Sequence, residues 1–71
     1  MREGVMSVYE QLPAQQARVV DLLLEGLSTK EIAKRMRLSQ YTVRNYLGVI
    51  FLRYGVKSRS ELIARELSAR I

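Results

Sequence analysis

Apolar residues recur at helical spacing along most of the chain, and each periodic stretch is bounded by start or stop signals. The pattern predicts four helices, over residues 13–25, 29–36 and 40–54, and from the capping box Ser58–Glu61 toward residue 69. Gly26 and Gly55 follow two of these stretches and are expected to cap them in the left-handed conformation. No strand pattern is present, so the predicted fold class is an all-α four-helix bundle.

Two start signals lie close together in the middle of the chain. Segment 27–32 combines a capping box, Ser28 and Glu31, with a hydrophobic staple formed by its two end residues. Segment 38–43 repeats the staple around a second cap residue, Ser39. Because the helices that they open are so close in sequence, they must cross at a steep angle. This geometry predicts a central helix-turn-helix.

The predicted 40–54 helix has two different faces. One stripe is apolar and is expected to be buried: Val43, Leu47, Ile50 and Tyr54. At 100° per residue, the opposite face carries Tyr41, Arg44, Asn45 and Gly48. A glycine inside a helix costs about 1 kcal/mol relative to alanine. Close approach of another surface, with DNA as one candidate, would explain Gly48.

Composition narrows the classes of function. The 71 residues are enough for one small domain, and 12 basic against 7 acidic residues give a net charge of +5. A basic balance alone is equally consistent with simple solubility, but beside a helix-turn-helix it favours nucleic acid. The absence of cysteine and histidine excludes disulfides, zinc fingers and histidine-dependent catalysis. No catalytic residue, metal site or cofactor is therefore expected.

The chain is expected to divide into two parts. Residues 1–11 have no clear period and contain Gly4, which predicts a flexible N-terminal lead-in or a frayed turn, and residues 12–71 form the helix-turn-helix domain. The lead-in lacks the apolar core of a signal peptide, and no apolar run approaches the length of a membrane span. We therefore expect a cytoplasmic protein without a membrane partner.

Residues 12–64 resemble the LuxR/GerE-type DNA-binding domain. The resemblance is carried by segments 22–33 and 38–44, and by Ile50 with segment 55–59. The first segment is also similar to the fourth region of sigma factors. The last segment, followed by a capped fourth helix, favours the LuxR/GerE type.

The resemblance implies a four-helix domain that binds promoter DNA, often as a dimer through the fourth helix. It implies a phosphate contact for Thr42 and a base or backbone contact for Arg44, which stands where the family usually has lysine. Asn45 and Gly48 match variable positions of the reading face. The sequence departs from the family at Tyr46, where histidine is frequent, and also at Pro13 and Tyr54.

The candidate DNA contacts combine the outward face with nearby polar and basic residues: Lys30, Gln40, Tyr41, Thr42, Arg44, Asn45, Tyr46, Gly48, Arg53 and Lys57. Arg44 is the first candidate because it lies early in the reading helix. Asn45 has the donor and acceptor pair that adenine requires, and Lys30 stands near a helix N-terminus that favours anions. Arg59, with Arg53 and Lys57, could extend the phosphate footprint, although each could equally be solvated.

The last predicted helix has more apolar surface than one packed stripe requires. A homodimer contact is predicted through Leu62, Ile63, Glu66, Leu67 and Arg70. The alternative is that the apolar residues of this helix cover the rest of the domain.

The leading functional hypothesis is a sequence-specific transcription regulator that places the 40–54 helix in the major groove of double-stranded DNA. The alternative is a small helix-turn-helix module that binds protein, holding RNA polymerase or another regulator. No nucleophile with a matching base is found, so an enzyme is not expected.

Overall fold

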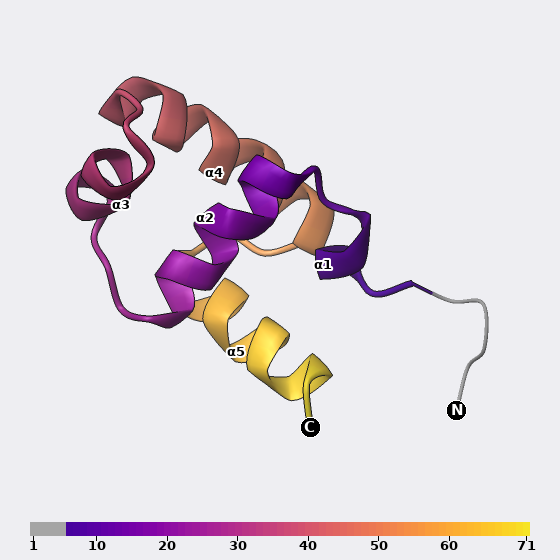
Figure 1. Ribbon diagram of the computed structural model, residues 1–71. Coiled ribbons are helices and arrows are strands. Elements are labelled where there is room, and N and C mark those ends of the chain that lie inside the picture. Colours follow the sequence, from indigo (N-terminus) through magenta and orange to yellow (C-terminus); the bar gives the residue numbers. More distant parts are fainter. Residues whose placement is uncertain (1–5) are drawn as a thin grey trace.

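The computed structural model describes residues 6–71, which form five helices (Figure 1). In chain order these are α1 (Val8–Gln11), α2 (Ala14–Leu24), α3 (Thr29–Met36), α4 (Gln40–Tyr54) and α5 (Arg59–Ala69). The all-α prediction is confirmed, and α2 to α5 match the four predicted helices to within about one residue at each end.

Within the predicted lead-in, for which the sequence indicated a flexible segment or a frayed turn, residues 8–11 form the one-turn helix α1. Ser7 caps this turn by accepting a hydrogen bond from the Glu10 backbone N–H, and the Glu10 carboxylate accepts one from the Ser7 N–H. The Ser7 and Glu10 pattern of this capping box is present in the sequence. A helix of one turn, however, is too short to show the apolar periodicity by which helices were predicted. Residues 1–5 lie outside the described residues, so the lead-in prediction is not addressed there.

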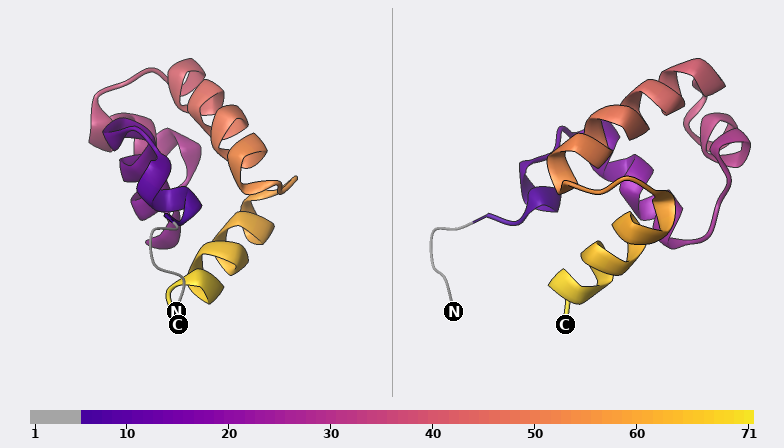
Figure 2. Two further views of the ribbon diagram at one scale, coloured as in Figure 1. Left: turned by 90° about the vertical axis from the view of Figure 1, so that its right-hand side faces the viewer. Right: turned by 180° about the vertical axis from the view of Figure 1, so that it is seen from behind.

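Helix α2 is the centre of the arrangement and contacts each of the other four helices. Figure 1 shows α4 and α5 on opposite sides of α2, with α3 beyond one end of α2 and α1 beside the other. The two rotated views in Figure 2 show the same order, with α4 and α5 as two diverging arms. The site predicted on α4 therefore lies on an outer arm of the molecule.

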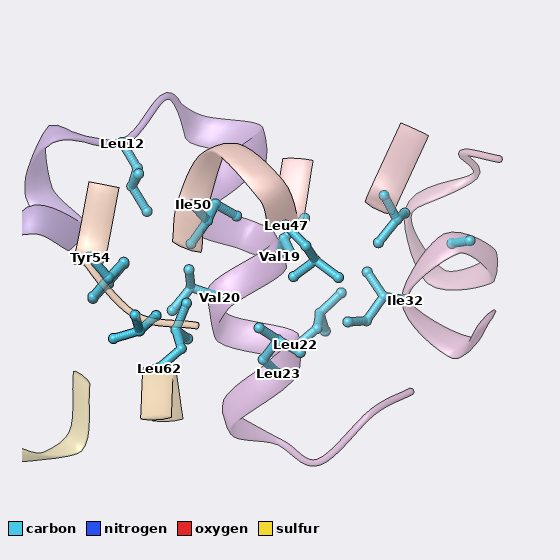
Figure 3. Close-up of a cluster of buried hydrophobic side chains, with 13 residues drawn as sticks. Leu12, Val19, Val20, Leu22, Leu23, Ile32, Leu47, Ile50, Tyr54 and Leu62 are labelled. Carbon is cyan, nitrogen blue, oxygen red and sulfur yellow. The ribbon is translucent and has the colours of Figure 1, made fainter. Parts of the chain in front are cut away.

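The core is built from apolar side chains of α2, α3, α4 and α5, together with one residue from each of the connections before α2 and after α4 (Figure 3). Its buried members are Leu12, Val19, Val20, Leu22, Leu23, Ile32, Ala33, Val43, Leu47, Ile50, Tyr54, Val56 and Leu62. All four residues of the stripe predicted for the 40–54 helix are among them. Burying a side chain of this kind contributes about 1.5–3 kcal/mol each, so this stripe fixes which face of α4 points outward.

Two glycines end helices as predicted. Gly26 follows α2 with a φ of 91°, and Gly55 follows α4 with a φ of 68°. Both values lie in the left-handed region, which glycine enters without the Cβ clash of other residues. Within residues 6–71, no helix has the length and apolar character needed to cross a bilayer.

Candidate nucleic-acid interface

Helices α3 and α4 form the predicted helix-turn-helix. Their connection is only residues 37–39, and it turns sharply because Arg37 adopts the left-handed conformation, with a φ of 59°. The Leu38 N–H then donates to the Ala33 carbonyl at 2.9 Å, which closes the end of α3. Figure 1 shows the two helices crossing steeply after this turn.

Both helices begin with the caps expected from the sequence. Ser28 Oγ accepts a hydrogen bond from the Glu31 N–H at 3.2 Å, and Glu31 Oε1 accepts one from the Ser28 N–H at 2.8 Å. These bonds to the charged form lower the pKa of Glu31, the backbone bond from Ser28 being the largest cause. Ser39 Oγ accepts a hydrogen bond from the Thr42 N–H at 3.0 Å. The start of α4 is therefore held in place independently of any ligand.

The hydroxyl of Thr42 is placed by the same cap. Ser39 Oγ donates to Thr42 Oγ1 at 3.0 Å, so the Thr42 oxygen is used as an acceptor. Among the described residues, no acceptor takes the proton of Thr42. A half-buried threonine with a free O–H at the start of α4 is able to donate to a phosphate oxygen.

The outward face of α4 is exposed as the sequence predicts. Tyr41 is 71% exposed, and Arg44, Asn45 and Gly48 are also exposed. Gln40, in the first turn of α4, is exposed as well. This face offers a phenol, a guanidinium and an amide to an outside surface.

Two apolar members of this face were not predicted from the sequence. Leu52 is 82% exposed and Val49 is 42% exposed. The rotation of 100° per residue places Leu52 about 20° from Tyr41, so the rule that found the outward face would also have found Leu52.

The charge around this face is entirely positive on α4 itself. The helix contains Arg44 and Arg53 and no acidic residue. Lys57, in the connection to α5, and Lys30, in the first turn of α3, are both exposed. Within residues 6–71, no ion pair engages these four cations, and their predicted contacts to phosphate stay a prediction.

Tyr46 is held by α2 and lies at the flank of the outward face. Its ring is half-buried, and its hydroxyl donates to Gln15 Oε1 at 2.6 Å. That proton is already used between α2 and α4, so Tyr46 would have to leave Gln15 to donate to a phosphate.

Arg59 is not a free cation at the end of α4. Its guanidinium donates to the Leu27 carbonyl at 3.2 Å and to Thr29 Oγ1 at 2.7 Å. Arg59 thus ties the start of α5 to the start of α3. The sequence did not reveal this role, because the partners lie 30 or more residues away along the chain.

For two of the five residues predicted to make a dimer contact, the prediction is wrong, because their side chains are buried inside the domain. Leu62 is fully buried in the core, and Glu66 is 3% exposed. The remaining apolar residues, Ile63 and Leu67, lie four residues apart on one face of α5, where Ile63 is half-buried and Leu67 is 51% exposed. An outward apolar stripe on α5 does exist, but it is narrower than predicted.

Glu66 is buried and is paired with two side chains, Tyr54 of α4 and Arg70, which follows α5. Its carboxylate accepts a hydrogen bond from the Tyr54 hydroxyl at 2.6 Å and another from Arg70 Nε. Arg70 also lies 3.9 Å from Asp21 and stacks over the ring of Tyr9, whose hydroxyl donates to Asp21 at 2.8 Å. Arg70, the fifth predicted dimer residue, is therefore engaged within its own chain.

This polar network also affects proton binding. Burial and the hydrogen bond to Glu66 raise the pKa of Tyr54. The hydrogen bond to Asp21 raises the pKa of Tyr9, and the bond to Glu66 raises the pKa of Arg70. A buried carboxylate is costly unless it is paired, so these partners are what allow Glu66 to face inward.

Comparison with known proteins identifies the family. Residues 10–65 match the family described as bacterial regulatory proteins, luxR family. The chain belongs to the LuxR family. The resemblance inferred from the sequence is thereby confirmed.

Two of the following three relatives of this LuxR-family chain are named as regulators. The probable HTH-type transcriptional regulator GfsR of Streptomyces halstedii is 44% identical over 66 residues, which are 93% of this chain and 27% of GfsR. The transcriptional regulatory protein DesR of Bacillus subtilis is 35% identical over 65 residues, 92% of this chain and 33% of DesR. The spore germination protein GerE of Bacillus subtilis is 33% identical over 67 residues, 94% of this chain and 90% of GerE.

The coverage differs among these relatives. The chain spans about a quarter of GfsR and a third of DesR, but nine-tenths of GerE. No solved structure gives a significant match.

Proposed function

We propose that this LuxR-family domain regulates transcription by placing the outward face of α4 in the major groove of duplex DNA. The observation that carries the proposal is the exposed stripe of Tyr41, Asn45 and Gly48, flanked by arginine on a helix without a carboxylate. Recognition helices of this motif contact bases with residues of their first turns. The relatives GfsR and DesR, which are named as transcriptional regulators, support the same function.

In this arrangement the side chains divide into two groups. Arg44 reaches guanine or a phosphate, and Asn45 has the amide that pairs with adenine. Lys30, Thr42, Arg53 and Lys57 contact phosphates and set the position of the domain on the duplex. Gln40 and Tyr41 lie at the entry of α4 into the groove. A cytoplasmic location is part of the same proposal, because the proposed ligand is DNA.

A homodimer through α5 completes the proposal. Ile63 and Leu67 provide the apolar stripe of a self-complementary contact between two copies. Two recognition helices would then meet half-sites about one turn of DNA apart. We expect the preferred site to be palindromic.

The test is a binding titration on a duplex selected from a random pool, at several salt concentrations. Affinity should fall by about 0.9 log units per phosphate contact for each tenfold rise in salt. Arg44→Ala should cost about 1–3 kcal/mol of binding free energy on the selected site.

The matched control is Arg35→Ala, because Arg35 is an exposed cation on α3 and its loss changes the net charge equally. Arg35→Ala should weaken binding less than Arg44→Ala. A salt-independent binding curve, or equal losses for the two variants, would contradict the proposal.

The second candidate function is a protein-binding module that holds RNA polymerase or another regulator. The observation in its favour is the same exposed stripe of Ile63 and Leu67 on α5. This function would be favoured if the protein captures a protein partner through α5 and does not retain the random duplex pool.

A further inference from the structure

The second half of α4 exposes two apolar side chains that are not part of the hydrophobic core of residues 6–71. Leu52 is 82% exposed, more than any other large hydrophobic residue within the helices of residues 6–71, and Val49 is 42% exposed. An exposed leucine alone is ordinary on a protein surface. Its position on this particular face is what calls for an explanation.

Leu52 lies in line with the residues proposed to read bases. At 100° per residue, Tyr41, Asn45, Gly48 and Leu52 fall within an arc of about 60°, with Val49 beside them. At 1.5 Å per residue, the line from Tyr41 to Leu52 is about 16 Å long. A surface that covers the first three residues therefore continues onto Leu52.

The charges on either side of this line indicate which kind of ligand covers it. Arg44 projects on one flank and Arg53 on the other, and α4 has no acidic residue between them. A strip of uncharged side chains with cations on both sides matches the major groove, which has phosphates on both rims and base edges on its floor. A purely apolar partner would not need these cations.

Only one feature of the groove floor is apolar, the C5-methyl group of thymine. Leucine and valine side chains make no hydrogen bonds, so placing them over any other base edge would remove water from polar groups without replacement. Gly48 leaves room for the helix to approach, so that short side chains reach the floor.

We propose that Leu52 and Val49 pack against thymine methyl groups, and that the preferred DNA carries thymines where the second half of α4 crosses the groove. This inference rests on the proposed DNA-binding function. With adenine read by Asn45, it makes each half-site rich in A·T pairs.

The test replaces individual thymines of the selected duplex with deoxyuridine, which keeps every hydrogen-bonding group and removes only the methyl. Each methyl covered by the wild-type protein should contribute about fourfold in affinity. Leu52→Ala should bind the thymine duplex several-fold more weakly than wild type and should discriminate thymine from uracil less. Val49→Ala should do the same at a different position of the site.

The controls separate this inference from DNA binding itself. Met6→Ala, which shortens an exposed apolar side chain before α1, should keep the full thymine preference. If wild type binds the selected duplex with the expected salt dependence but tolerates deoxyuridine at every position, the thymine contact is wrong and the DNA-binding function stands. If no duplex is retained, both proposals fail.

Discussion

At the scale of single residues, no contact among residues 6–71 requires a glycine at position 48. A Cβ added there would meet no heavy atom within 4 Å, and the backbone is ordinary α-helix. Glycine in a helix interior destabilises the fold by about 1 kcal/mol relative to alanine. Since nothing within the described residues offsets this cost, the missing side chain is best explained by close approach of an outside surface.

Gly48→Ala should therefore stabilise the free protein while weakening its binding to DNA. The free energy of unfolding in urea should rise by up to about 1 kcal/mol, because alanine has the better helix propensity. Affinity for the selected duplex should fall, because the added methyl group separates α4 from the groove.

Ser68→Ala is the matched control, since Ser68 is exposed on α5 and also gains helix propensity. It should raise stability slightly without changing the affinity. Stronger DNA binding by Gly48→Ala would rule out a close approach at this position.

At the scale of helices, the boundaries that the sequence predicted correctly are those set by local signals. Ser28 and Ser39 fix the starts of α3 and α4 through bonds to residues three positions away, so the boundaries could be found without the fold. The burial of the Glu66 side chain could not be predicted, because its partner Tyr54 lies 12 residues away and charged residues normally face water. The tie between Arg59 and α3 was hidden for the same reason.

The capping box of α3 should make the stability of the domain depend on acidity. The pKa of Glu31 is lower in the folded protein than its ordinary value of 4.5. The carboxylate therefore contributes stability that is fully present above about pH 4.5 and is lost as the pH falls through the folded value. Glu31→Gln should remove this contribution, because the glutamine amide keeps its acceptor oxygen but does not titrate.

The measurement is the urea unfolding free energy at about pH 7 and about pH 3, for wild type and Glu31→Gln. The difference between the two pH values should be smaller in the variant. Glu25→Gln serves as control, because no capping bond to the Glu25 side chain is found in residues 6–71, and it should keep the larger difference. Equal differences in all three proteins would show that the capping box does not contribute.

At the scale of the whole molecule, hydrogen bonds join α5 to α3 and α4, the two helices of the proposed DNA interface. Arg59 bonds to the start of α3, and Arg65 Nη1 donates to the Tyr54 carbonyl at the end of α4, at 2.9 Å. A dimer formed through the outward stripe of α5 would therefore hold two copies of α4 at a fixed separation. The sequence predicted α5 as the dimer helix but could not show which of its apolar residues the core uses.

Leu67→Glu should convert the proposed dimer into a monomer without unfolding it, because Leu67 is half exposed and a charge at an apolar contact is repelled by its copy. Sedimentation of the free protein should report the change in mass. Affinity for a palindromic duplex should fall, while affinity for a single half-site should be nearly unchanged. The control, Ser68→Glu, adds the same charge at the next position and should remain dimeric; a monomeric wild type would contradict the prediction.

The absence of any carboxylate on α4, in a chain that also lacks histidine, has a consequence for how this surface responds to the cell. Its two arginines have no carboxylate on the same helix with which to form an ion pair. In the proposed complex, phosphates therefore bind these arginines without displacing an acidic side chain of α4. Release of the proposed DNA would then depend on competing salt, on dissociation of the proposed dimer, or on a partner that covers α4.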